Sequence, residues 1–313
     1  MKILKNEFSF PSSNGINTIR GIKVFNEAGP YRGMVEISHG MVEHYDRYID
    51  FMEFLATQGF VVYMHDHLGH KHSVDNDEQL GYFAPENGYI HVLRDLLHTA
   101  KLAKKEYPEL KLFLLGHSMG SFFARVFASI HSDVIDGVLI SGTGGGTKAA
   151  GAAGLAAVKA MKLIKGDKHR SETMNNIAFG KYLEKIENPD TKSDWITRDK
   201  EIVRQYVNDK YTQFVFTLNG FETLMEIITL SNSEETYEKT SKDLPVYIFS
   251  GSMDPVGDYG MGVMQVFDNY KKSGCTDVTV KIYDGGRHEM LNEINRSEVY
   301  ADVLNWLVSK VEE

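Results

Sequence analysis

The stretch 113–128, FLLGHSMGSFFARVFA, contains the only Gly-x-Ser-x-Gly pattern of the chain. An apolar run precedes Gly116 and a run with helical spacing follows Gly120, which predicts a strand, a tight turn and a helix. Glycines are needed on both sides of Ser118 because a Cβ atom would clash in so tight a turn. The turn would push the Ser118 hydroxyl out above a sheet, beside a helix N-terminus that favours negative charge.

Two later strand ends offer the partners that a nucleophilic serine needs. A serine hydroxyl requires a neutral imidazole to take its proton, and the imidazole requires a carboxylate that fixes its tautomer. Asp254 follows the apolar run LPVYIFSG, and His288 follows the run DVTVKIYDGG. Taken singly, Asp254 is also explained as a turn residue and His288 as a surface histidine. The three residues in this order, each past a strand end, predict a Ser-His-Asp triad.

The negative oxygen of a tetrahedral intermediate needs two N–H donors. The residue after the nucleophile, Met119, supplies one from its backbone, and a loop after an early strand supplies the other. The stretch EISHGMVEH ends such a strand at His39 and Gly40, so the backbone of Met41 is the second predicted donor.

The rest of the chain alternates between strand-like and helix-like segments. Helical spacing is found, for example, at 46–58 and 89–107. The predicted strands lie within 33–40, 60–67, 111–118, 134–142, 244–251 and 277–286. This alternation predicts an α/β fold with a mainly parallel central sheet flanked by helices.

The alternation stops after residue 142 and resumes near Leu244, leaving about a hundred residues of helical character. We therefore predict a core formed by residues 1–142 and 241–313, and a helical cap inserted at 143–240 over the carboxyl ends of the strands. The Gly-rich stretch TGGGTKAAGAAG is predicted to be a linker into the cap.

The stretch HDHLGHKH, residues 65–72, raises the question of a metal site. Its H-x-H-x-x-H spacing is close to the H-x-H-x-D-H of metallo-β-lactamases, but Gly69 stands where the aspartate should be, and no downstream ligand set follows. Asp66, Gly69 and Ser73 instead hold most of a D-x-x-G-x-G-x-S loop, with Lys71 at the second glycine. We predict a loop beside the site and no metal.

Composition narrows the classes of partner. The net charge is 34 − 43 = −9 and no basic run occurs, which argues against a nucleic acid partner. No segment reaches the roughly 20 apolar residues of a membrane span, and residues 1–15 lack the apolar region of a secretory signal. The single cysteine, Cys275, fits a reducing compartment. These features predict a cytoplasmic protein.

Five stretches carry a resemblance to a known family. SHGMVEHYDRY, DHLGH, GHSMGS, SGSMDPVG and GGRHEMLNE are similar to motifs of the monoacylglycerol lipase and lysophospholipase family of α/β-hydrolases, bacterial branch. DWITRD (194–199) resembles a cap signature of the same branch. The resemblance implies the α/β-hydrolase fold, no cofactor, and an ester with one acyl chain as substrate. It also implies Ser118 as nucleophile, His288 as base and then acid, and Asp254 as its orienting carboxylate.

Other functions remain open at this point. The same fold serves short-chain carboxylesterases, amidases and peptidases, and some members bind ligands without catalysis. The apolar segments 149–164 and 213–230 are candidates for the wall of an acyl tunnel or for the interior of the cap. Transient contact of the cap with a lipid surface is a further possibility, and the oligomeric state is left open.

Overall fold

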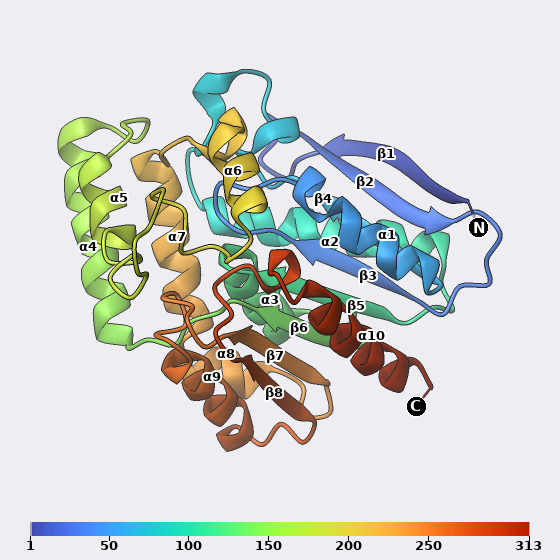
Figure 1. The fold of residues 1–313 in the computed structure, drawn as a ribbon. Helices are drawn as coiled ribbons and strands as arrows, with labels where there is room; N and C mark the ends of the chain where they lie inside the picture. The colour runs from blue at the N-terminus through green and yellow to red at the C-terminus, as the bar shows by residue number, and fades with distance from the viewer. Residues whose placement is uncertain (1, 313) are drawn as a thin grey trace.

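The computed structural model describes residues 2–312, without the side chain of Lys148. Within this range a single sheet has eight strands in the order β1-β2-β4-β3-β5-β6-β7-β8 (Figure 1). The pairs β1 with β2 and β2 with β4 are antiparallel, and the other neighbouring pairs are parallel. The strands are β1 (Ile3–Pro11), β2 (Thr18–Asn26), β3 (Gly33–Ser38), β4 (Phe60–His65), β5 (Leu112–His117), β6 (Gly137–Ser141), β7 (Val246–Gly251) and β8 (Val278–Tyr283). The predicted α/β class with a mainly parallel sheet is confirmed.

Helices cover both faces of the sheet and divide the core into two layers (Figure 1). On one face, α1 and α10 pack against side chains such as Val35 and Phe113; on the other, α2, α3 and α9 pack against Met34 and Leu114. Adjacent residues of one strand thus enter opposite layers, as the pleat requires. These helices are α1 (Ile49–Thr57), α2 (Gly88–Glu106), α3 (Met119–Ile130), α9 (Met261–Lys272) and α10 (Arg296–Glu312).

The segment between β6 and β7 forms five helices among the described residues. They are α4 (Lys148–Lys165), α5 (Glu172–Phe179), α6 (Lys200–Asn208), α7 (Leu218–Ser231) and α8 (Glu234–Lys239). Figure 1 shows α4 and α5 outside α7, which lies next to the core helices. We call α4 to α7 with their connecting loops the cap. Its predicted boundaries at residues 143 and 240 remain a prediction.

The glycine-rich entry to the cap is not the linker that we predicted along its whole length. Helix α4 begins at Lys148, so the second half of TGGGTKAAGAAG is helical. A Cβ at Gly151 would lie 2.5 Å from Thr229 Oγ1, and one at Gly154 would lie 3.0 Å from Met225 Sδ. These glycines therefore let α4 and α7 approach closely, which explains a glycine-rich helix where a linker was expected.

A buried arginine joins the core to both ends of the insertion. The guanidinium of Arg125, on α3, donates to the carbonyl of Gly144 at 3.1 Å and to that of Ser231 at 2.6 Å. It also donates to Asn232 Oδ1 at 2.9 Å and to the hydroxyl of Tyr237. One side chain thus contacts the segment entering the cap and the segment leaving it.

Candidate active site

Ser118 lies in the turn between β5 and α3 with a backbone φ of 52°, a left-handed conformation that is costly for a residue with a Cβ atom. The close approach of the chain around it requires the two flanking glycines. A Cβ at Gly116 would lie 2.3 Å from the carbonyl oxygen of Gly120, and one at Gly120 would lie 2.0 Å from that of Ser38. The strand, turn and helix predicted from the Gly-x-Ser-x-Gly pattern are therefore present.

His288 and Asp254, predicted from separate strand ends, are in direct contact. The imidazole Nδ1 of His288 lies 2.9 Å from Oδ1 and 3.0 Å from Oδ2 of Asp254, and both residues are buried. Asp254 also accepts hydrogen bonds from Ser250 Oγ at 2.9 Å and from the Val256 N–H at 2.9 Å. These bonds orient the carboxylate so that Nδ1 of His288 carries the proton and Nε2 is left as the acceptor.

The electrostatics of this pair favour a protonatable imidazole. Burial alone would lower the pKa of His288, but the carboxylate of Asp254, with smaller contributions from Glu289 and Glu43, outweighs this effect and raises the pKa. Burial alone would raise the pKa of Asp254, but His288 and the hydrogen bonds to Ser250 and Val256 lower it. The carboxylate therefore stays ionised while the imidazole gains affinity for a proton.

The two predicted oxyanion donors are the backbone N–H groups of Met41 and Met119. Met119 is the first residue of α3, so its N–H is not used by the hydrogen bonds of the helix itself. The N–H groups on either side of Met41 are already engaged: Gly40 donates to Glu43 Oε2 at 3.2 Å and Val42 donates to His70 Nε2 at 3.2 Å. This holds the backbone around Met41, whose own N–H has no acceptor among the described residues.

A cavity of about 710 Å³ brings these groups together under the cap. Ser118, His288, Met41 and Met119 all line it, while Asp254 lies behind His288. The cap contributes apolar side chains, among them Phe179, Leu183, Trp195, Phe214, Leu224 and Ile228. The segment 213–230 therefore does contribute to the wall, whereas no residue of 149–164 lines the cavity. Helix α4 packs against α7 instead.

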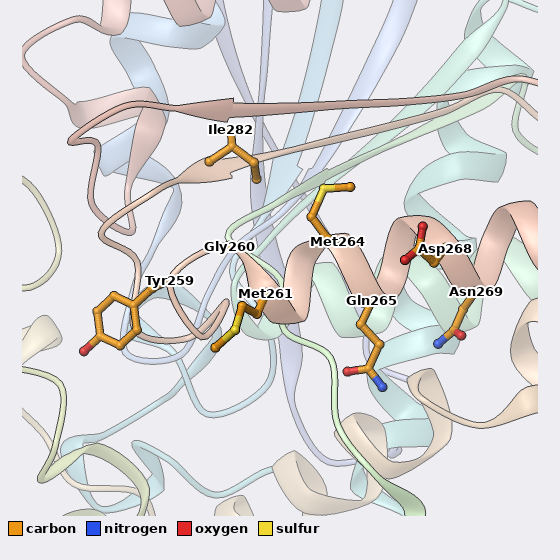
Figure 2. A pocket seen from close by; sticks show the side chains of 8 residues that line it. All are labelled: Tyr259, Gly260, Met261, Met264, Gln265, Asp268, Asn269 and Ile282. Atoms are coloured by element: carbon orange, nitrogen blue, oxygen red, sulfur yellow. The ribbon is translucent and has the colours of Figure 1, made fainter.

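A second recess, of about 720 Å³, lies at the start of α9 beside β8. Figure 2 shows Met261, Met264 and Gln265 on α9, with Ile282 of β8 next to them. Its lining contains neither histidine nor serine, and its Met261 is 66% exposed. Its one carboxylate, Asp268, has no imidazole or serine beside it in the lining, whereas the cavity under the cap holds Ser118 and His288 together and is therefore the candidate active site.

Three of the four histidines of HDHLGHKH, His65, His67 and His70, are buried near the segment 39–42 that contains Met41, which we call the oxyanion loop after its predicted role; the fourth, His72, is half-buried. His39 Nε2 accepts from the N–H of His67 at 2.9 Å, and His70 Nε2 accepts from Val42 at 3.2 Å. Burial lowers the pKa of His70 to about 4 and holds those of His39 and His67 well below their usual range. Among the described residues no group of three or more His, Cys, Asp or Glu side chains could hold a metal ion. The neutral rings thus support the loop as hydrogen-bond acceptors.

These buried rings predict a specific loss of stability in acid. Burial lowers the pKa of His65 to about 3, whereas an unfolded histidine titrates near 6.5. Below pH ~6.5 the unfolded chain takes up a proton at this site and the folded chain does not, which costs up to about 1.4 kcal/mol per pH unit. His65→Asn removes this titration and keeps a polar atom where Nδ1 contacts Thr99 Oγ1 at 2.9 Å.

Urea unfolding of both proteins at pH 7.5 and 5.5 checks this prediction. The free-energy advantage of the unmodified protein over His65→Asn should shrink by about 1 kcal/mol at the lower pH. An advantage that is unchanged between the two pH values would mean that the buried ring takes up protons as readily as an unfolded one.

Sequence reasoning missed several residues around the imidazole. The ring of Trp195 lies 4.9 Å from that of His288, and the ring of His117 lies 4.7 Å away. The N–H of Glu289 donates to the carbonyl of Ile196 at 2.7 Å, which ties the cap to the segment that carries His288. DWITRD, which contains Trp195, was singled out by resemblance, but nothing in its spacing indicated this contact.

Residues 29–295 match the family described as "Serine aminopeptidase, S33". The chain belongs to this family. It is a serine hydrolase with the α/β-hydrolase fold, as the resemblance of its motifs implied. None of the helices within residues 2–312 has both the length and the apolar character needed to cross a membrane.

Known relatives cover nearly the whole chain. A monoacylglycerol lipase from Mycolicibacterium smegmatis is 25% identical over 97% of this chain and 98% of that protein. A monoglyceride lipase from Homo sapiens is 26% identical over 91% of this chain and 85% of that protein. Among solved structures, a carboxyl esterase from Bacillus coagulans in complex with glycerol has a TM-score of 0.91 and 29% identity, covering 98% of this chain and 99% of that one.

Proposed function

We propose that this serine ester hydrolase cleaves esters of lipids with a single acyl chain, such as monoacylglycerols or lysophospholipids. The observation that carries the proposal is the cavity under the cap, which joins Ser118 and His288 at one end to an apolar wall from the cap. A cavity of about 710 Å³ lies within the range of small-molecule sites. An apolar wall next to a polar reacting centre suits a substrate with one long chain and one polar head.

In the proposed mechanism, Ser118 Oγ attacks the ester carbonyl while its proton passes to Nε2 of His288. The carbonyl oxygen becomes an anion that accepts hydrogen bonds from the N–H groups of Met41 and Met119. Collapse of this intermediate breaks the bond to the alcohol, which leaves with the proton from His288. Water then attacks the acyl-Ser118 ester and gives a proton to His288; the bond between the acyl carbon and Ser118 Oγ breaks, His288 returns the proton to Oγ, and the fatty acid departs. Asp254 keeps the imidazole oriented and stabilises its charged form.

The family description includes aminopeptidases, and a specific observation favours an ester over a peptide with a free amine. The carboxylates that line the cavity are Glu43, Glu172 and Glu289. Glu43 and Glu289 both contact Arg47, at 3.3 Å and 2.7 Å, and Glu172 is exposed. Glu172 is thus the one lining carboxylate not paired with Arg47, and it faces water, so the described residues offer no buried, unpaired carboxylate in the cavity to bind a substrate ammonium group.

A panel of glyceryl esters with acyl chains from acetyl to oleoyl, together with amino-acid amides, tests the substrate class. Medium and long chains should give kcat/KM values at least about tenfold above acetyl, because each buried methylene contributes up to about 0.8 kcal/mol. Amides should be poor substrates. A preference for acetyl would favour the alternative of a short-chain carboxylesterase, and faster cleavage of amides would favour a peptidase. Slow turnover with tight retention of the ligand would favour a binding protein.

We also propose that the outer side of the cap contacts the lipid surface that supplies the substrate. Leu163, Ile164 and Ile177 are 90%, 81% and 69% exposed, and none of them lines the cavity. Replacing Leu163 and Ile164 by serine should lower activity on vesicles that contain a long-chain monoacylglycerol by about threefold or more. Activity on a water-soluble butyrate ester should be unchanged. Equal activity of both proteins on vesicles would contradict this contact. The cytoplasmic location remains a prediction.

A further inference from the structure

Arg47, whose side chain is only 11% exposed, bridges two loops of the candidate site that are distant in the sequence. Arg47 lies in the short 3₁₀ helix Tyr45–Tyr48, just after the oxyanion loop. Its Nη1 donates to Glu289 Oε1 at 2.8 Å and its Nη2 donates to Oε2 at 2.7 Å. Nη1 also lies 3.3 Å from Glu43 Oε1. The two parallel bonds to Glu289 form the fork geometry in which guanidinium and carboxylate bind most specifically.

The two carboxylates that contact Arg47 belong to different parts of the site. Glu43 Oε2 accepts from the N–H of Gly40, the residue before Met41, at 3.2 Å and from the Tyr48 hydroxyl at 2.6 Å. Glu289 directly follows His288 in the chain. Through Arg47, the loop that offers an N–H to the oxyanion is therefore connected to the loop that carries the imidazole.

The cap covers this bridge. The guanidinium of Arg47 lies 4.7 Å from the ring centre of Tyr206, on helix α6, in a cation–π arrangement. Tyr206 also lines the cavity beside Glu43 and Glu289. The ionic groups are thus shielded from water by an aromatic ring of the cap, so that their interaction is stronger than that of an exposed pair.

We propose that Arg47 is a positioning residue of this active site. It fixes the position of the oxyanion loop relative to the loop that carries His288, and its positive charge offsets the negative charge of Glu289 next to the imidazole. This inference rests on the proposed function, because it assigns the imidazole of His288 the role of base.

The effect of Arg47 on the pKa of His288 can be separated from its effect on packing, because few charged groups surround the imidazole. The titratable groups that surround it from the neighbouring elements are Asp254, Glu289, Glu43, His117 and Tyr182. Burial lowers the pKa of His117 to about 3 and raises the pKa of Tyr182, so both are neutral near pH 7. Burial also raises the pKa of Glu43. Besides Asp254, Glu289 is the carboxylate that raises the pKa of His288 most, ahead of Glu43.

The guanidinium of Arg47 keeps the carboxylate of Glu289 ionised. Burial alone would raise the pKa of Glu289, but the guanidinium of Arg47 outweighs this and lowers it to about 2. Glu289 is therefore ionised at neutral pH, and its effect on His288 is offset by the positive charge beside it. Removing the charge of Glu289 takes away a group that raises the pKa of His288, whereas removing Arg47 takes away the positive charge that offsets it, so the two substitutions have opposite consequences for the proton affinity of the imidazole.

The test is the pH dependence of kcat/KM, whose acid limb reports the pKa of the base in the free enzyme. In Arg47→Met the uncompensated Glu289 should move this limb to higher pH by about half a unit or more. In Glu289→Gln the loss of the carboxylate charge, with Arg47 still present beside Glu43, should move the limb to lower pH by a similar amount. The double variant should return close to the unmodified protein. A residue that only supports packing would lower kcat without moving the limb in opposite directions.

A charge-conserving variant tests the positioning role separately. Arg47→Lys keeps the positive charge but loses the fork, so the limb should stay within about 0.2 units while kcat falls about tenfold. Arg94→Met, on the exposed side of α2, is the matched control and should change neither quantity. If Arg47→Met fails to fold, the shift in the nearly isosteric Glu289→Gln decides the charge effect.

The outcomes also separate this inference from the proposed function. An unmodified protein that hydrolyses no ester would overturn the proposed function itself. If the unmodified protein is active, two results would overturn the role of Arg47 and leave the proposed function standing. One is an acid limb at the same pH in Glu289→Gln and Arg47→Met. The other is an unchanged kcat in Arg47→Lys.

Discussion

Ser118→Ala should lower kcat for ester hydrolysis by about 10⁴-fold or more, with little change in the free energy of unfolding. The hydroxyl is the group that becomes acylated, so no other atom at this position can replace it. The methyl group of alanine fits where the serine side chain lies, and removing the hydroxyl leaves the backbone conformation at φ 52° as it was. Initial rates on a medium-chain glyceryl ester, with urea unfolding alongside, check both parts.

Asp254→Asn should cost a similar amount, about 10⁴-fold in kcat, because an amide at this position can donate to Nδ1 and stabilise the wrong tautomer of His288. Asp268→Asn is a matched control: the carboxylate is exposed on α9, in the recess of Figure 2. It should leave kcat unchanged. A full loss of activity in Asp268→Asn, with Asp254→Asn active, would move the active site to that recess.

Gly120→Ala should have the largest effect on stability of any single methyl addition in the turn. The new Cβ would lie 2.0 Å from the carbonyl oxygen of Ser38 and 2.6 Å from that of His39. Both are backbone atoms of β3 and the loop after it, so they cannot move away as a side chain could. Either α3 or β3 must shift, and we expect a loss of about 3 kcal/mol or more in the free energy of unfolding.

Gly146→Ala is the control for this prediction. Its Cβ would find only Asn232 within 4 Å, at 3.5 Å, which is an ordinary contact. Its stability should stay within about 0.5 kcal/mol of the unmodified protein. A Gly120→Ala protein with the same urea midpoint as Gly146→Ala would contradict the tight turn on which the geometry of Ser118 depends.

The parts of the fold that could be predicted have strong local patterns. The six parallel strands are rich in apolar residues and are buried throughout except for the edge strand β8, and the structure places each inside its predicted range, with ends shorter by a few residues. Strands β1 and β2 were missed. Most of β1 is exposed or half-buried, and polar residues such as Lys5 and Asn6 interrupt its apolar pattern. An edge strand that buries little apolar surface has no strong pattern to detect.

The same reasoning applies to the site. Ser118, Asp254 and His288 could be found because each follows a strand whose carboxyl end faces the same edge of the sheet. The pair formed by Arg47 and Glu289 spans 242 residues, and neither side chain lies in a pattern that indicates the other. Its existence depends on how two loops pack in three dimensions. Likewise, the stretch with Gly151 and Gly154 was assigned to a linker, because the helix packed against these glycines is more than seventy residues away in the sequence.

The most direct test of the central claim is to react the folded protein with a fluorophosphonate probe and locate the adduct by mass spectrometry. A single adduct on Ser118, absent from Ser118→Ala and formed far more slowly by His288→Ala, is the result that this account predicts. A protein that hydrolyses esters yet forms no adduct at Ser118, or that keeps its activity as Ser118→Ala, would contradict it.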